Sequence, residues 1–268
     1  MSTERAYSDY QTIELAFNEG ILIVRFHTHD GPLEFSMDAH SEWVRLWTEI
    51  AEDPSVRLVI LTGTADAFIT ARKKLPGGAQ RSSGMTPQYW RRIMRECTAH
   101  VLKMLDVPVP IIAAVNGPIR NHSELALLSD IVIATPDATI QDMSHFPEQA
   151  IPTDLQHVLM PELIGRIRAS YYFYSGRAID AAEAQQLGLY NEIVTRERLM
   201  ERAVQTARWI LRQPDINLQY FRRVSTHDLR AKMNALLEYG LAMEGLAAMG
   251  ADWTDWTVDP EGLPPLPA

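Results

Sequence analysis

The feature that most restricts the fold is a pair of short apolar runs in the middle of the chain. They run from Val109 to Val115 and from Ile131 to Ala134, and the turn Asn116-Gly117-Pro118 follows the first. Short, continuous apolar runs bounded by turn residues are typical of strands buried on both faces. The polar cluster Asn121-His122-Ser123-Glu124 lies between them, where a short helix is expected. Polar groups at the ends of buried strands are held by a rigid scaffold, so this stretch is the first candidate for an active site.

The rest of the chain alternates strand patterns with helix patterns. Residues 12–26 predict a hairpin that turns at Asn18-Glu19-Gly20, and residues 56–63 predict a further buried strand. Helices are expected over Asp38–Ala51, with Asp38 as the N-cap, and over Pro87–Leu105. Further helices are expected over Ser123–Ser129, Thr153–Leu163, Ile167–Ser175, Ala181–Leu187, Arg196–Arg212 and Asp228–Met249, and a last strand over Glu192–Thr195. This order predicts an α/β fold of loosely repeated ββα units over residues 1–195, followed by a helical region and a Trp- and Pro-rich tail over residues 196–268.

Composition narrows the classes of function. The formal net charge of the 268 residues is −9, with acidic and basic residues mixed, whereas binding to nucleic acid needs a concentrated basic face. The single cysteine, Cys97, excludes an intrachain disulfide and a zinc site built on cysteines. No apolar run is long enough to span a bilayer, and Met1 to Asp9 is polar. We therefore expect a cytoplasmic protein with neither a nucleic-acid nor a membrane partner.

Four segments carry a resemblance to a known family. In order, they are VRLVILTGTADAF, VPIIAAVNGP, LSDIVIATPDATI and SGRAIDAAEAQQLGLYNEIV. Their sequence and spacing are similar to those of the crotonase (enoyl-CoA hydratase/isomerase) superfamily, over roughly residues 12–250. The resemblance implies a crotonase-like spiral of ββα units and a helical C-terminal region that serves trimerisation. It also implies a homotrimer or a dimer of trimers.

The chain departs from the typical acyl-CoA members of that family. A glycine triplet that helps to bind the thioester oxyanion is replaced by Asn121-His122-Ser123, and the other oxyanion donor corresponds to the backbone N–H of Thr70. The two catalytic glutamates of the hydratases correspond to Leu125 and to Ser144 or His145. Adding water to an enoyl thioester requires both carboxyl groups, so these departures argue against a hydratase.

One branch of the superfamily matches the pattern more fully. The segment NGPxxNHxE, the loop Gln-Asp-x-x-His-Phe-Pro that ends in Pro-x-Asp, and a late Glu-x-Leu-Ala-Ala helix resemble the β-diketone hydrolases, which include 6-oxocamphor hydrolase. These enzymes cleave a carbon–carbon bond between two carbonyls by a retro-Claisen reaction, without CoA or another cofactor. The resemblance implies a small-molecule diketone as the substrate. The catalytic residues that it implies are His122, His145, Asp154 and Glu244, and the substrate-binding residues are Phe35, Thr70, Asn121 and Phe146. A tryptophan of the camphor enzyme corresponds to Phe35, which cannot donate a hydrogen bond and so indicates a different diketone or pose.

The residue types suit the chemistry of this reaction. The imidazole of His145 could take a proton from water, and Asp154 could bond the other ring nitrogen and fix the tautomer. His122, at the start of a short helix, could donate to the oxyanion or to the enolate oxygen. Glu244 could hydrogen-bond a histidine or handle the enolate proton.

Three alternatives stay open at this stage. A CoA-thioester hydrolase or isomerase could use the same histidines, with Arg72-Lys73-Lys74 as a site for an anionic group. A non-catalytic crotonase-fold binding protein would leave the four candidate side chains apart in space. A metal site of His122, His145 and Asp154 is conceivable, although the branch that the chain resembles needs no metal. The other histidines, His40 and His100 among them, show no pattern that separates them from ordinary core or surface residues.

Overall fold

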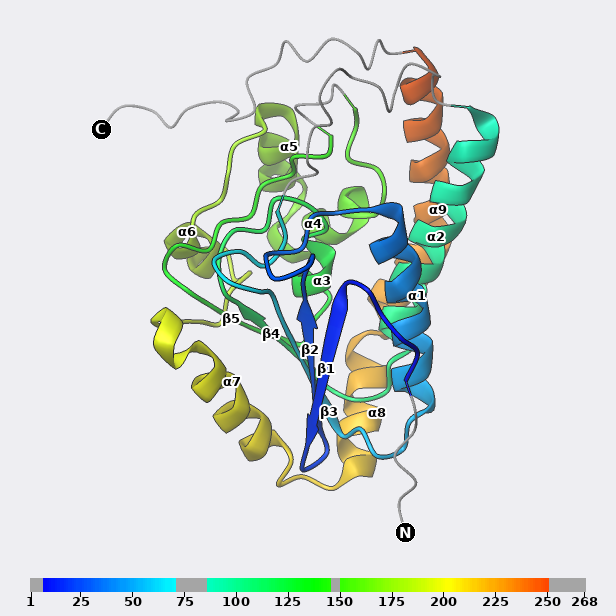
Figure 1. Ribbon diagram of the computed structural model, residues 1–268. Coiled ribbons are helices and arrows are strands. Elements are labelled where there is room, and N and C mark those ends of the chain that lie inside the picture. Colours follow the sequence, from blue (N-terminus) through cyan, green and yellow to red (C-terminus); the bar gives the residue numbers. More distant parts are fainter. Residues whose placement is uncertain (1–6, 71–85, 146–149, 251–268) are drawn as a thin grey trace, which may run out of the picture.

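The computed structural model describes residues 7–70, 86–145 and 150–250 of the chain. Within these ranges the strands form one sheet in the order β1-β2-β3-β4-β5-β6 (Figure 1). Their bounds are β1 Ile13–Asn18, β2 Ile21–Phe26, β3 Leu58–Thr62, β4 Ile111–Val115, β5 Ile131–Ala134 and β6 Glu192–Ile193. The hairpin β1–β2 is antiparallel, and every later pair is parallel. The predicted α/β class is therefore confirmed.

The helices connect and cover these strands. Their bounds are α1 Met37–Glu52, α2 Pro87–Asp106, α3 Glu124–Leu127, α4 Gln156–Ile164, α5 Arg166–Ser175, α6 Ala181–Gln186, α7 Arg196–Ile210, α8 Asp215–Ser225 and α9 His227–Gly250. Helix α1 begins at Met37, one residue earlier than predicted, and the side chain of Ser36 accepts a hydrogen bond from the N–H of Ala39 at 3.2 Å. Ser36, and not Asp38, is thus the N-cap. No described helix is long and apolar enough to cross a membrane.

A second row of short pairings lies beyond the carboxyl ends of the strands. Ile69 pairs in parallel with Ile119, which in turn pairs in parallel with Ile140. Each of these residues follows a strand of the main sheet by a few positions, so each unit of the chain contributes a main strand and then a short second one. This is the spiral of ββα units that the resemblance implied.

Both faces of the sheet are buried, and each face has its own helices. Val59, Leu61 and Ile111 belong to the larger core with α1 and α2, whereas Leu58 and Ile60 meet α7 on the opposite side. Figure 1 shows α1, α2 and α9 standing together on one side of the strands and α7 crossing the other. Burying one Val, Leu or Ile side chain stabilises a fold by roughly 1.5–3 kcal/mol, so apolar runs of this kind fix the sheet between its two helical layers.

Helix α8 was not predicted from the sequence. It connects the C-terminal helices to the sheet. Its Arg222 is 2% exposed and donates from Nε to the carbonyl of Val107 at 2.8 Å. The same guanidinium pairs with Asp130, whose carboxylate also accepts the N–H of Ile111 at 2.7 Å. The start of β4, the end of α2 and α8 therefore share one ionic contact, in which the guanidinium is buried and the carboxylate reaches the surface.

Candidate active site

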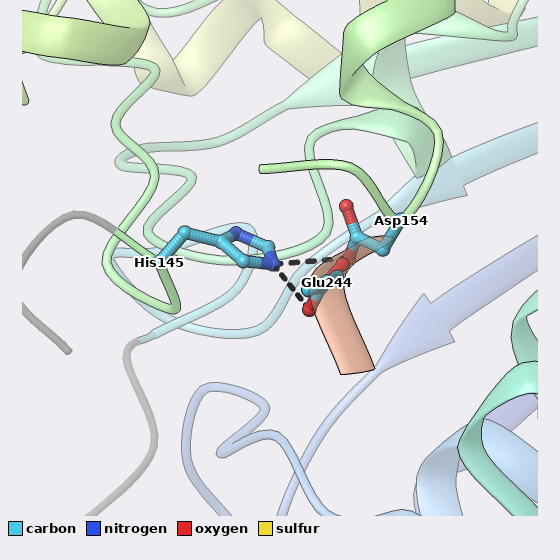
Figure 2. A group of neighbouring side chains, drawn as sticks. All are labelled: His145, Asp154 and Glu244. Atoms are coloured by element: carbon cyan, nitrogen blue, oxygen red, sulfur yellow. Dashed lines mark ion pairs between the residues drawn. The ribbon is translucent and has the colours of Figure 1, made fainter. Parts of the chain in front are cut away.

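Candidate catalytic side chains gather where the carboxyl ends of the parallel strands meet α9. His122 follows β4, His145 lies in the loop after β5, and Asp154 stands two residues before α4. Glu244 reaches them from α9, near the far end of the described chain. Figure 2 shows the ring of His145 aimed at the carboxylates of Asp154 and Glu244. The structure thus brings these three predicted residues together.

The two nitrogens of His145 have different partners. Nδ1 lies 2.6 Å from Oδ2 of Asp142, whose Oδ1 accepts the backbone N–H groups of Ser144 at 3.0 Å and His145 at 3.2 Å. Nε2 faces Oε1 of Glu244 at 3.3 Å and Oδ2 of Asp154 at 3.6 Å (Figure 2). Asp142 therefore occupies the orienting position that sequence reasoning gave to Asp154, whereas Asp154 shares the Nε2 side with Glu244.

Two glycines allow α9 to carry Glu244 into this position. A Cβ on Gly245 would lie 2.2 Å from Nε1 of Trp90 in α2, and one on Gly240 would lie 2.2 Å from Cε1 of His157 in α4. Trp90 also donates from Nε1 to the carbonyl of Leu241 at 2.9 Å. Glycine costs about 1 kcal/mol relative to alanine inside a helix. Here that cost is offset by close packing on both sides of Glu244.

The electrostatics of the cluster favour a mobile proton. Burial alone would lower the pKa of His145, but the three carboxylates around its ring raise it well above its usual value. Burial raises the pKa of Asp154 to about 7, an effect that the ring of His145 opposes and the charge of Glu244 increases. Burial would also raise the pKa of Asp142, but His145 and the backbone N–H groups outweigh it and lower that pKa. Near neutral pH, Asp154 is therefore the member of the His145–Asp154 pair that gains and loses a proton. A general base must exchange a proton in this pH range.

His122 lies in a second, adjoining cluster. Its Nδ1 is 2.6 Å from Oε1 of Glu124, and its ring centroid is 4.3 Å from that of Phe35. The rings of Trp43 and His40 lie 5.0 and 5.4 Å away. The backbone φ of His122 is +50°, in the left-handed region that few non-glycine residues adopt, so the surrounding contacts hold its position.

A hydrogen-bonded side chain connects the two clusters. Gln156, the first residue of α4, donates from Nε2 to the hydroxyl of Ser123 at 3.0 Å and lies 3.5 Å from Oε2 of Glu124. It follows Asp154 by two residues. The loop that carries Asp154 and the short helix that follows His122 are therefore fixed to each other.

The remaining predicted residues have different outcomes. Thr70 cannot act as the predicted oxyanion donor in this arrangement, because its N–H and its hydroxyl both donate to the carbonyl of Leu33 at 2.9 Å. Asn121 is buried beside His122. Phe35 lies against His122 as described above, and Phe146 and Arg72-Lys73-Lys74 lie outside the described residues.

Sequence reasoning missed several polar groups of the site. Asp142 was quoted within the Gln-Asp-x-x-His pattern without a role, although a carboxylate three residues before a histidine can reach its ring. Glu124, His40 and His100 were not assigned to the site, because a buried polar side chain in an amphipathic pattern gives no local signal. A small cavity of about 40 Å³ also adjoins this region, lined by Ser123, Asp142, Gln156, Tyr172 and Arg177 among others. None of the four predicted catalytic side chains lines it.

The His145 cluster also has the donor set of a cation site. One ligand atom each from His145, Asp154 and Glu244 lie within 4.8 Å of one another. An imidazole with two carboxylates suits a divalent transition metal, and the bond from Nδ1 to Asp142 is the usual outer contact of a metal-bound histidine. The geometry is therefore compatible with either proton transfer or metal binding.

Comparison with known proteins places the chain in a family. Residues 16–245 match the sequence model of the Enoyl-CoA hydratase/isomerase family. The 1,2-epoxyphenylacetyl-CoA isomerase of Escherichia coli strain K12 is 25% identical over 238 residues, which span 88% of this chain and 90% of the isomerase.

Two solved structures are similar over almost the whole chain. A β-diketone hydrolase from the cyanobacterium Anabaena sp. PCC 7120, bound to (S)-3-oxocyclohexyl acetic acid, is 34% identical, with a TM-score of 0.85 over 90% of this chain and 95% of that one. An enoyl-CoA hydratase/isomerase from Mycobacterium paratuberculosis is 26% identical, with a TM-score of 0.83 over 92% and 98% of the two chains. The chain belongs to the enoyl-CoA hydratase/isomerase family and is an enzyme of the crotonase superfamily.

Proposed function

We propose that this enzyme hydrolyses a carbon–carbon bond of a cyclic β-diketone by a retro-Claisen reaction. The observation that carries the proposal is the arrangement around His145, with Asp142 on one ring nitrogen and Asp154 and Glu244 on the other. Such a ring is fixed in orientation and exchanges protons on one side only. The similarity to the Anabaena β-diketone hydrolase supports the same reaction class.

The reaction starts with a water molecule next to Nε2 of His145. The His145–Asp154 pair takes a proton from the water, and the hydroxide adds to one carbonyl carbon. The tetrahedral oxyanion then collapses to a carboxylic acid, and the bond to the carbon between the two carbonyls breaks. Its electron pair moves to the second carbonyl as an enolate, which is protonated on carbon. The product is one keto acid, and the sum of atoms is the diketone plus one water.

His122 is the donor for the negative charge that develops on oxygen. Its ring carries a proton on Nδ1 toward Glu124 and, when charged, a second on Nε2 that can be donated. Loss of one such donor typically costs about 3–4 kcal/mol in the transition state. Phe35 provides an apolar wall beside this ring, which suits a hydrocarbon ring of the substrate better than a charged group.

The ligand of the Anabaena enzyme suggests the first substrate to test. In 3-oxocyclohexyl acetic acid, one ring carbon lies next to the ketone on the side away from the acetic acid arm. Joining the carboxyl carbon to this ring carbon, with loss of water, gives the bicyclic 1,3-diketone bicyclo[2.2.2]octane-2,6-dione. We expect this compound to be opened to the keto acid, measured by chromatography and loss of diketone absorbance. His145→Ala should reduce kcat by about 100- to 10,000-fold. His227→Ala, an exposed residue at the start of α9, is the matched control. No turnover of a panel of mono- and bicyclic β-diketones by the wild-type enzyme would refute the proposal.

A CoA-thioester hydrolase or isomerase is the second candidate, because the curated relative from Escherichia coli acts in its name on a CoA compound. Against it stand the absence of the hydratase glutamates at Leu125 and Ser144 and the engagement of the Thr70 N–H by Leu33. The discriminating assay offers acyl- and enoyl-CoA thioesters beside the diketones. Thioester turnover that exceeds diketone turnover would favour this candidate.

A metal-dependent hydrolase would use the same His145, Asp154 and Glu244 side chains. We propose the metal-free reaction, in keeping with the β-diketone hydrolases that the sequence resembles. Dialysis against EDTA is expected to leave the diketone hydrolysis rate unchanged. A loss of activity that Zn²⁺ or Mn²⁺ restores would transfer the role of the His145–Asp154 pair to a metal-bound water.

A further inference from the structure

The tautomer of His122 is fixed by a buried carboxylate. Oε1 of Glu124 lies 2.6 Å from Nδ1 of His122, and Glu124 is only 2% exposed. Burial would raise the pKa of Glu124, but the rings of His122 and His100 outweigh burial and hold that pKa well below its usual value. An ionised carboxylate accepts hydrogen bonds and donates none. Nδ1 of His122 therefore carries a proton.

A row of buried side chains that starts on α1 extends to Glu124. The indole of Trp47 donates from Nε1 to Nδ1 of His100 at 2.9 Å, and both side chains are buried. An indole N–H can only donate, so Nδ1 of His100 accepts and the proton of this ring is on Nε2. Burial lowers the pKa of His100, which keeps the ring neutral. Its Nε2 is 3.4 Å from the same Oε1 of Glu124 that faces His122.

The other ring nitrogen of His122 is left available. Among the described residues, none is a hydrogen-bond partner of Nε2, and 8% of the side chain is exposed. The titratable groups that face this ring are Glu124 on α3, His40 on α1 and His100 on α2. Burial lowers the pKa of His40 to about 4, so it stays neutral near pH 7. Glu124 is then the charged group among them.

We propose that Glu124 is a positioning residue that holds His122 with its proton on Nδ1 and presents Nε2 to the substrate, and that Trp47 and His100 fix Glu124 in turn. The negative charge of Glu124 stabilises the positive charge of His122 when Nε2 also carries a proton. The use of that proton in catalysis rests on the proposed function, in which charged His122 stabilises the oxyanion and protonates the enolate carbon. Deprotonated His122 regains its proton from solvent, while the His145–Asp154 pair releases the one that it took from water.

The site therefore contains two histidine–carboxylate pairs of similar geometry. Nδ1 is 2.6 Å from a carboxylate oxygen in His145 with Asp142 and in His122 with Glu124. The pairs differ in what faces Nε2. Two carboxylates face Nε2 of His145, whereas among the described residues Nε2 of His122 has no hydrogen-bond partner. The first pair thus suits proton uptake, and the second suits proton donation.

The tautomers can be read without any substrate. In ¹⁵N NMR spectra of the enzyme labelled at its histidine rings, neutral His122 is expected as the Nδ1–H form and His100 as the Nε2–H form at pH 7–8. Trp47→Phe removes the donor to His100 and is expected to produce a mixture of the two His100 tautomers. His122 found as the Nε2–H form in the wild-type enzyme would overturn the proposal.

The second test uses the isosteric variant Glu124→Gln, which keeps the shape and removes the charge. We expect kcat for the diketone to fall by about 100-fold. We also expect His122 to lose its preference for the Nδ1–H tautomer in the ¹⁵N spectra, because a carboxamide can donate to Nδ1 as well as accept from it. Glu42→Gln is the matched control, since Glu42 is equally buried on α1 but accepts its hydrogen bonds from Gln11 and Thr12. It should lower thermal stability without changing the tautomer of His122.

The outcomes separate this inference from the proposed function. If the tautomers are as stated but no diketone is hydrolysed, the positioning of His122 by Glu124 stands and the reaction must be sought among other substrates. If diketones are hydrolysed but Glu124→Gln keeps both kcat and the Nδ1–H tautomer of His122, Glu124 has only a structural role and the inference is wrong. Glu124→Asp, which retains the charge, should recover part of the lost rate if the charge is what matters.

Discussion

Oδ2 of Asp142 lies 2.6 Å from Nδ1 of His145, and this pairing determines what the other ring nitrogen can do. With Nδ1 bound, only Nε2 can exchange protons, and it faces the carboxylates of Asp154 and Glu244. Asp142 and Asp154 thus lie on opposite sides of one ring, and their pKa values are shifted in opposite directions. The pKa of Asp142 is lowered by His145 and by backbone N–H groups against the effect of burial, whereas burial raises that of Asp154. Their amide variants should therefore have opposite effects on stability.

Asp142→Asn should destabilise the protein at neutral pH. A carboxyl whose pKa is lowered on folding stabilises the fold above its unfolded pKa, and this contribution is lost as the pH falls through the folded pKa. Removing the charge costs about 1.5–3 kcal/mol, the range for a hydrogen bond to a charged group. Chemical unfolding at pH 7 measures it. The destabilisation relative to wild type should shrink below about pH 4, where the wild-type carboxyl also loses its charge.

Asp154→Asn should instead stabilise the protein while it removes activity. A carboxyl with a raised pKa binds more protons in the folded state, so stability falls as the pH rises from about 4 to about 7. The amide avoids this loss, and we expect a gain on the order of 2 kcal/mol at pH 8 that vanishes near pH 4. Melting temperatures at the two pH values test this. A variant that is less stable than wild type at pH 8 would show that Asp154 is stabilised as a carboxylate.

The pH dependence of catalysis should report the same group. If the His145–Asp154 pair must lose a proton before it can accept one from water, kcat/KM for the diketone rises as the pH increases through about 7. In Asp154→Asn this limb should disappear, together with at least a 100-fold loss of rate. A limb that persists in the variant at the same pH would assign the titration to another group.

Sequence reasoning reached most of the fold, because its evidence is local. Buried strands such as Ile111–Val115 are recognised as continuous apolar runs, and Thr86 and Pro87 mark the start of α2. Helix α8 was not predicted, although Ile216, Tyr220 and Val224 recur at a helical spacing and Pro214 directly precedes the helix.

The site was predicted less completely, for a physical reason. His145, Asp154 and Glu244 were recognised through a family pattern. The distances between them depend on how α9 packs, and no single residue of α9 determines that packing. The role of Asp142 depends on a loop that bends back within three residues. Glu124 and His100 come from segments that are far apart in sequence and meet only in the folded core.

The packing of α9 itself can be tested at Gly245. In Gly245→Ala the new Cβ would lie 2.2 Å from Nε1 of Trp90, so the indole or the helix must move. We expect the stability to fall by about 1–3 kcal/mol, as for other overpacked sites, and kcat to fall because Glu244 moves with the helix. Asn234→Ala, at an exposed position of α9, is the control and should change neither quantity appreciably. Full activity of Gly245→Ala would show that the position of Glu244 is not critical.

Phe35 should act through both the substrate and His122. Its ring centroid lies 4.3 Å from that of His122, so Phe35→Ala removes one wall of the histidine and part of the apolar surface. Aromatic contacts are worth about 0.5–1.5 kcal/mol beyond area burial, which predicts roughly a 2- to 10-fold loss in kcat/KM. Steady-state kinetics with Phe17→Ala, an exposed residue of β1, as the control would measure this. An unchanged kcat/KM would exclude Phe35 from substrate binding.

The last prediction concerns the ionic contact that ties α8 to the core. Arg222→Ala removes the partner of Asp130 and leaves the carbonyl of Val107 without its side-chain donor, whereas the carbonyl of Met104 keeps the N–H of Val107. The side chain of Asp130 is 25% exposed and can be solvated after the change, so the expected cost is about 1–3 kcal/mol, the cost of leaving a buried acceptor without a donor. The neighbouring Arg223→Ala is the control, because Arg223 is exposed and such changes usually stay within about 0.5 kcal/mol. Chemical unfolding of both variants measures the difference. Equal stabilities would mean that α8 is held by its apolar contacts alone. The expected loss would show that Arg222 fixes this helix, which the sequence did not predict. Its partner Asp130 lies 92 residues earlier in the chain.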